Sequence, residues 1–135
     1  MVVYMQIMTL DGEPHATVWN RYLRADFATW SVGQDCQVHS HQDAIEIFVF
    51  LDGACEMTVG DEVQMVSAGH AVYVGPNMPH KLKAIGDRPL KMFLFVSPNH
   101  EPTHTMLEAD GGTRNTNRPP PGPEILWLGK GDGEI

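Results

Sequence analysis

The hydrophobic and polar positions of this chain alternate over short stretches, and no long pattern of period 3.6 persists. Runs rich in Val, Ile, Phe, Tyr and Met are separated by Gly, Asp or Pro, which is typical of β-strands between turns. The predicted strands are 2–8, 17–23, 36–41, 45–51, 55–59, 62–66, 71–74, 80–85, 90–96 and 125–128. This regular spacing indicates an all-β barrel or sandwich.

Two tight turns lie between predicted strands. LDG at 51–53 and VGDE at 59–62 each contain a glycine that can adopt positive φ, so we expect a hairpin at both.

The segment 98–135 is rich in Pro and Gly, and prolines cannot donate to a ladder, so we expect an extended C-terminal arm or loop. Its apolar EILWLG stretch is expected to dock on the barrel or on a neighbouring subunit. His100 and His104 have the spacing of a helical metal-binding pair, but Pro102 argues against a helix and favours a solvated loop.

Alternation also assigns faces. In the strand that begins at His80, two lysines occupy the alternate positions, so they mark the solvent side and His80 points inward. In the strand 90–96, Lys91 shares its face with Phe93 and Phe95. Both faces of that strand therefore favour burial. The terminal arm, a second sheet or a partner subunit could cover the outer face, and we expect a homodimer.

Length and composition limit the class of protein. The 135 residues, 42% hydrophobic, suit a single domain over 1–135. A formal charge of −8 argues against nucleic acid or an anionic membrane as the main partner. No stretch approaches the roughly 20 apolar residues that span a bilayer, and Cys36 and Cys55 suit free thiols. We therefore expect a soluble, cytoplasmic protein.

The segment GQDCQVHSHQDAIEIFVFLDG, from Gly33 to Gly53, carries the candidate chemistry. His39 and His41 lie one residue apart on a predicted strand and project to the same face. Glu46 can join them across a short turn. Imidazoles with a carboxylate suit Fe(II), Mn(II), Ni(II) or Zn(II), so the segment predicts a metal site; the alternative is a core of histidines without metal.

At these residues the chain resembles the cupin family. Its first motif (G, five residues, HxH, three or four residues, E, six residues, G) is matched completely over 33–53. The second motif, over 69–80, is matched in part: Gly75 stands where the family has Pro, and Asn77 where it has Gly. Asn tolerates a left-handed conformation, so Asn77 can preserve that turn. His80 stands at the last metal ligand, and Ala84 replaces a common Asn.

The resemblance implies an antiparallel jelly-roll β-barrel with extended terminal arms and one divalent ion (Fe, Mn, Ni or Zn) held by His39, His41, Glu46 and His80. It implies a metal-dependent enzyme acting on a small organic molecule, with dioxygenase chemistry favoured and Glu46 as a candidate base. The alternatives are a non-catalytic metal-dependent module that binds a metabolite, and a sugar isomerase or lyase. Residues that share a face with the ligands are expected to line the pocket: Gln37, Phe48, Phe50 and Leu82.

Overall fold

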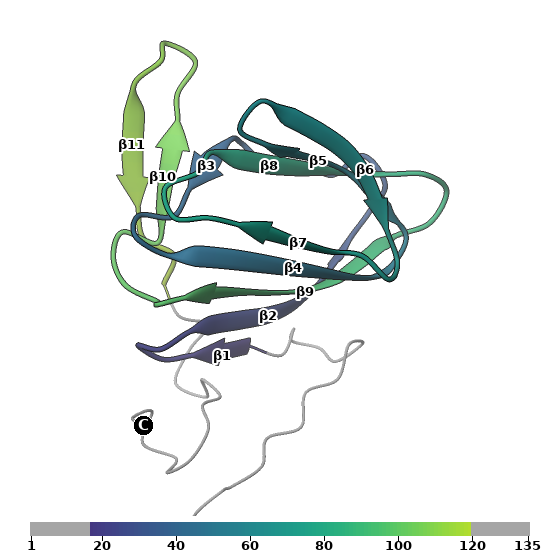
Figure 1. Ribbon diagram of the computed structural model, residues 1–135, viewed down its shortest axis with the longest axis horizontal. Helices are drawn as coiled ribbons and strands as arrows, with labels where there is room; N and C mark the ends of the chain where they lie inside the picture. Colours follow the sequence, from purple (N-terminus) through teal and green to yellow (C-terminus); the bar gives the residue numbers. More distant parts are fainter. Residues whose placement is uncertain (1–16, 120–135) are drawn as a thin grey trace, which may run out of the picture.

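A computed structural model describes residues 17–119 of the chain, and these residues form antiparallel β-strands (Figure 1). The strands are β1 (Thr17–Trp19), β2 (Arg24–Trp30), β3 (His39–Ser40), β4 (Ile45–Asp52), β5 (Ala54–Val59), β6 (Glu62–Ser67), β7 (Ala71–Val74), β8 (His80–Ile85), β9 (Leu90–Ser97), β10 (His104–Leu107) and β11 (Thr113–Thr116). The predicted strands 2–8 and 125–128, and the docking of EILWLG, fall outside the described residues.

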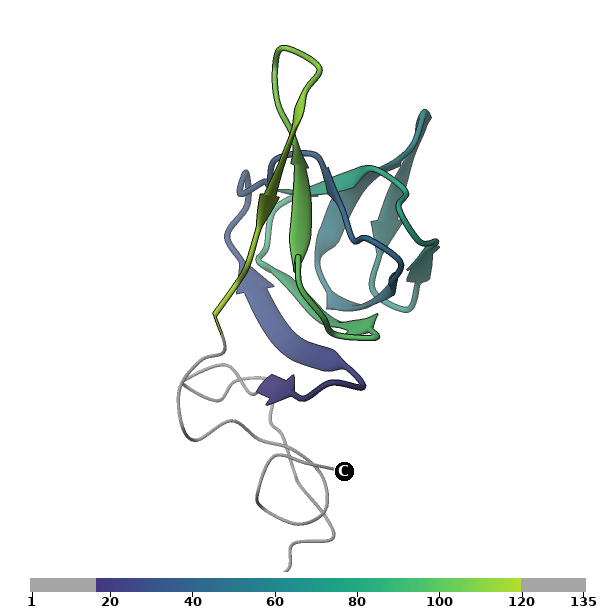
Figure 2. The same cartoon turned by 90° about the vertical axis from the view of Figure 1, so that its left-hand side faces the viewer.

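The strands form two sheets that face each other. One sheet has the order β1-β2-β9-β4-β7 and the other the order β11-β10-β3-β8-β5-β6. Figures 1 and 2 show the two layers with the interior between them and the β10–β11 hairpin extending from one end. Within residues 17–119 no strand pairing closes the sheets into a continuous barrel. The all-β, jelly-roll type of fold predicted from the sequence is confirmed.

The interior changes character along the length of the strands. At one end, Arg24 on β2 lies opposite Val96 on β9, which in turn lies opposite Glu46 on β4. Farther along the same strands, Met92 pairs with Phe50. We call the end with Arg24 and Glu46 the polar end, and it also contains the buried histidines. We call the end with Phe50 and Met92 the apolar end. The most deeply buried residues at the apolar end are Phe50, Cys55, Ala84, Leu90 and Met92.

The two predicted hairpins have different outcomes. β5 pairs with β6 around Gly60, whose φ is 59°, as expected. The LDG turn is not a hairpin, because β4 pairs with β7 and β9 whereas β5 belongs to the other sheet. Gly53, at φ 78°, carries the chain between the layers, and a Cβ there would lie 2.5 Å from the Pro89 carbonyl oxygen. A tight glycine turn thus fits a crossover between sheets as well as a hairpin.

Three strand regions depart from the sequence prediction. The strand predicted over 36–41 is reduced to β3, His39–Ser40. The strand expected over 17–23 is instead short β1, and β2 was not predicted because Arg24 and Asp26 interrupt its inward apolar pattern. After Ser97, part of the segment expected to be an arm or loop forms the β10–β11 hairpin, and β10 pairs with β3. Pro98, Pro102 and Pro119 lie outside β10 and β11, so they do not interrupt the ladder of this hairpin.

The predicted faces of the other strands agree with the structure. Lys81 and Lys83 are exposed on β8, whereas His80 is buried. On the outer face of the five-stranded sheet, the ring centroid of Phe93 lies 4.9 Å from that of Phe27 and 6.2 Å from that of Phe95. These rings are half-buried, and a homodimer that covers them stays a prediction. No helix long and apolar enough to cross a membrane occurs within the described part of the chain.

Candidate metal centre

Four buried side chains from both sheets converge at the polar end. His39 lies on β3, His41 directly follows it, His80 begins β8, and Glu46 comes from β4 in the opposite layer. One ligand atom from each lies within 4.8 Å of all the others. Ligands on opposite sides of a metal lie about 4 Å apart, twice the usual bond length. Small side-chain shifts would therefore close the cluster on one ion.

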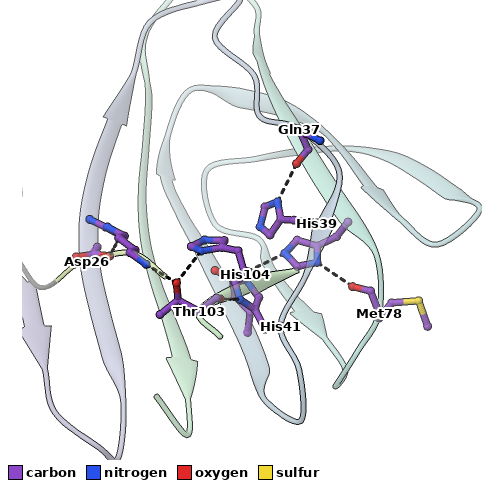
Figure 3. Close-up of polar contacts among 10 residues, drawn as sticks. Asp26, Gln37, His39, His41, Met78, Thr103 and His104 are labelled. Carbon is purple, nitrogen blue, oxygen red and sulfur yellow. Dashed lines mark hydrogen bonds and ion pairs between the residues drawn. The ribbon is translucent and has the colours of Figure 1, made fainter. Parts of the chain in front are cut away.

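Each imidazole is held by a backbone carbonyl. The Nδ1 atoms of His39, His41 and His80 lie 2.8, 2.7 and 2.9 Å from the carbonyl oxygens of Gln37, Thr103 and Met78. Figure 3 draws His39 beside Gln37 and His41 beside Thr103. A carbonyl only accepts hydrogen bonds, so each Nδ1 carries the proton and donates it. In the neutral ring, Nε2 is then left as a lone pair directed at the cluster, which is the form that binds a metal.

The contacts of Glu46 place a carboxylate oxygen against two imidazole nitrogens. Its Oε1 lies 2.9 Å from Nε2 of His41 and 2.8 Å from Nε2 of His80. If both rings are neutral with Nδ1 protonated, lone pairs face lone pairs and repel. A proton on each Nε2 removes this repulsion, and so does a metal ion bound by all the facing atoms. The donor set and its orientation therefore fit a divalent metal.

The electrostatics of the site favour a neutral His39 beside an ionised Glu46. Burial, with the nearby His80 adding to it, lowers the pKa of His39 to about 4, so this ring is uncharged at neutral pH. Burial alone would raise the pKa of Glu46, but hydrogen bonds from His41 and His80 outweigh it and hold that pKa well below its usual range. A neutral nitrogen and a charged oxygen are the states in which these groups bind metal.

Two turns that border the site are joined to each other. Asp43 and Asn77 both have positive φ, 53° and 62°, so Asn77 does adopt the left-handed conformation expected of it. The Asp43 amide donates to Oδ1 of Asn77, and Nδ2 of Asn77 donates to Oδ1 of Asp43, each at 3.1 Å. The Asn77 amide also donates to the carbonyl of His41. These bonds tie the loop before Glu46 to the loop before His80.

A cavity of about 380 Å³ adjoins the cluster and is lined by His39 and Glu46. Of the predicted pocket residues, Phe48 and Leu82 line it. Phe50 is instead buried at the apolar end, and the exposed Gln37 side chain donates to the Leu107 carbonyl. Phe50 lies too deep in the interior to line this cavity, and the irregular segment before β3 turns the Gln37 side chain outward. A second cavity of about 410 Å³ between β6 and β7 lacks the clustered residues.

Several residues at the cavity were not predicted as site residues. His104, which we expected in a solvated loop, begins β10, and its ring centroid lies 5.1 Å from that of His39 and 5.0 Å from that of His41 (Figure 3). Arg24, Asp26 and Arg118 line the same cavity. The HEPTH spacing drew attention to His104, but only the pairing of β10 with β3 brings it to the cluster.

Comparison with known proteins agrees with the fold. Residues 27–97, just over half of the chain, match the family described as the cupin domain. An uncharacterized protein of Methanocaldococcus jannaschii is 35% identical over 77 residues, which are 56% of this chain and 62% of that protein. The match thus spans less than two thirds of that relative's length.

Two solved structures have the same fold. One is an uncharacterized protein with a double-stranded β-helix domain from Klebsiella pneumoniae, with a TM-score of 0.62 and 17% identity over 86% of this chain and 100% of that one. The other is a DMSP lyase from Ruegeria pomeroyi, with a TM-score of 0.59 and 22% identity over 69% of this chain and 47% of that one. At such identities the likeness concerns the fold alone.

Proposed function

This chain belongs to the cupin domain family, and we propose that it is a metal-dependent enzyme that acts on a small organic molecule. The observation that carries the proposal is the convergence of His39, His41, Glu46 and His80 in a cluster whose His39 and Glu46 line a cavity. A metal centre that adjoins a cavity serves binding or chemistry, whereas a purely structural site is closed by its protein ligands.

The residues have separate tasks in this proposal. The three histidines would hold the ion through Nε2, since each Nδ1 already donates to a carbonyl. Glu46 would bind it as a carboxylate and balance part of its charge; a further role as a base stays a prediction. When bound, the ion supplies Lewis acidity, and Fe(II) also supplies electrons for oxygen chemistry.

The first experiment is metal analysis of the purified protein before and after reconstitution with Fe(II), Mn(II), Ni(II) or Zn(II). We expect one divalent ion per chain in the wild type and sharply reduced retention in His41→Ala. His70→Ala is the matched control, because His70 is exposed and lies outside the cluster. Absence of stoichiometric metal in every preparation, or unchanged metal content in His41→Ala, would contradict the proposed site.

The second experiment separates catalysis from binding. Oxygen consumption by the Fe(II)-loaded protein is measured against a panel of phenols, diketones and thiols, with His41→Ala as the control. Turnover that depends on His41 supports dioxygenase chemistry. Product formation without oxygen uptake would replace it with isomerase or lyase chemistry, and binding without any turnover would favour the non-catalytic module.

A further inference from the structure

The inward face of β2 places an arginine beside the candidate metal centre. Arg24 is only 3% exposed, and it lies in register with Val96, itself in register with Glu46. Arg24 lines the same cavity of about 380 Å³ as His39 and Glu46. The guanidinium and the predicted metal ligands thus border one shared space.

The neighbouring carboxylates have other partners. Asp26 Oδ2 accepts from Arg118 at 3.0 Å, and Glu46 is contacted by His41 and His80. Among residues 17–119, no acceptor lies within hydrogen-bond or ion-pair distance of the Arg24 guanidinium. Every fully buried polar side-chain atom of the described chain has a partner, so the nitrogens of Arg24 must border open space.

The contact of Arg24 with Trp19 leaves its hydrogen-bond donors available. Its Cζ lies 5.6 Å from the centroid of the Trp19 ring, which is a cation–π contact. Stacking engages the face of the guanidinium and leaves its five N–H donors, which lie in the plane, without acceptors. These donors face the cavity, where they can form charge-assisted hydrogen bonds to an anion.

The rest of the cavity indicates what accompanies that anion. Phe48 and Leu82 are almost fully buried and, with Leu94, line the cavity. His104 also lines it, but burial, and secondarily the charge of Arg24, lowers its pKa to about 3, so it is neutral. With a divalent ion in place, cationic groups would outnumber carboxylates at this cavity, although the whole chain carries a formal charge of −8.

We propose that the cavity takes a small organic acid, whose carboxylate pairs with Arg24 and whose hydrocarbon or aromatic body lies against Phe48, Leu82 and Leu94. A planar carboxylate matches the fork of a guanidinium and can accept two parallel hydrogen bonds. This substrate class deepens the proposed function and rests on it for turnover, but the binding step is measurable by itself.

The test compares acids with their neutral amides in calorimetric titrations of the Zn(II)-loaded wild type. The probes are benzoate and 3-phenylpropionate, each against benzamide and 3-phenylpropionamide. We expect each acid to bind about tenfold to a hundredfold more tightly than its amide, the usual range for hydrogen bonds to a charged group. Equal affinities, or no binding by either acid at millimolar concentration, would overturn the proposal without any variant having to fold.

Variants then assign the preference to Arg24. Arg24→Gln should lose the preference for acids, and Arg24→Lys should keep part of it. Arg88→Gln should leave it intact, because Arg88 is 63% exposed and pairs with Asp52 on the surface. Circular dichroism and thermal unfolding establish that each variant is folded. An Arg24→Gln protein that still prefers acids as the wild type does would overturn the assignment.

Metal analysis, together with a titration of the metal-free protein, separates this proposal from the proposed function. If metal is retained in stoichiometric amount but acids bind no better than amides, the acid proposal fails and the metal centre stands. If no metal is retained but acids still bind through Arg24, the metal-dependent enzyme fails and the anion site stands.

Discussion

The two ends of the interior are built on the same strands and serve different purposes. At the apolar end, Phe50, Leu90 and Met92 are at most 1% exposed and have only hydrocarbon or sulfur to bury. At the polar end, Arg24 and Glu46 are nearly as buried, at 3% and 4%, yet both carry charge. Burial of charge opposes folding unless partners compensate it.

This comparison teaches that the fold separates stability from chemistry along the strand direction. β4 has Glu46 near one end and Phe50 near the other, and β8 runs from His80 to the buried Ala84. The inward positions of both strands point into the same interior, so the division lies between the two ends and not between the two sheets. Substitutions at one end should therefore affect metal binding, and substitutions at the other should affect stability.

The largest expected effect is on metal affinity. His80→Ala removes one Nε2 ligand, so metal affinity should fall by more than about a hundredfold, beyond the usual effect of losing a group that only orients a ligand. Competition with a chromophoric chelator measures it. Phe50→Ala, at the apolar end, should keep the metal affinity of the wild type in its folded fraction. A shared loss of affinity in both variants would break the separation of the two ends.

The next effect is on the free energy of unfolding. Phe50→Ala should lower it by about 3–5 kcal/mol, because a fully buried ring is lost and a cavity is left. Val63→Ala is the control: Val63 is 54% exposed, so its change should stay within about 0.5 kcal/mol. Urea unfolding of the metal-free proteins gives both values. A change below about 1 kcal/mol for Phe50→Ala would show that the apolar end does not dominate stability.

The polar end should make the metal-free protein sensitive to acid. In the folded state the pKa values of His39 and His104 are lowered from 6.5 to about 4 and about 3, both chiefly by burial. Between pH 6.5 and these values the unfolded chain binds more protons, so stability falls as pH decreases, by up to about 1.4 kcal/mol per pH unit for each ring. Glu46, whose pKa is also lowered, adds a loss below its ordinary value of 4.5.

Urea unfolding of the metal-free protein from pH 7 to pH 4 measures this slope. His104→Gln should reduce the slope, because one of the two shifted rings is gone. His100→Gln is the matched control, since His100 is exposed and should not alter the slope. A wild-type stability that is constant over this range would refute the acid sensitivity assigned to the polar end.

The smallest expected effect is on thiol reactivity. Cys55 is fully buried at the apolar end, and burial raises its pKa to about 12. Cys36 is half-buried and lines the cavity, where burial also raises its pKa. Iodoacetamide should therefore label Cys36 slowly and Cys55 only on unfolding. Peptide mass spectrometry over time identifies the order, and labelling of Cys55 first would contradict the burial difference.

The sequence by itself determined much of the fold and most of the metal cluster. Alternation placed His80 on the buried face of its strand, and the HxH spacing placed His39 and His41 together. Side-chain alternation is a local property of extended backbone, so it requires no knowledge of what the strand packs against. The motif around Glu46 added the fourth predicted ligand, which the structure brings to the same cluster.

Only the tertiary structure decided which distant segments meet. The LDG turn joins two sheets instead of two paired strands, because pairing partners depend on long-range contacts that a turn does not encode. The strand β2 was not predicted from the sequence, because Arg24 faces the cavity and its charge breaks the apolar alternation by which strands are recognised. His104 joined the cluster because β10 pairs with β3, about 65 residues earlier in the chain. The local pattern thus identified the residues of the candidate metal centre, and long-range pairing placed an arginine and a further imidazole beside them.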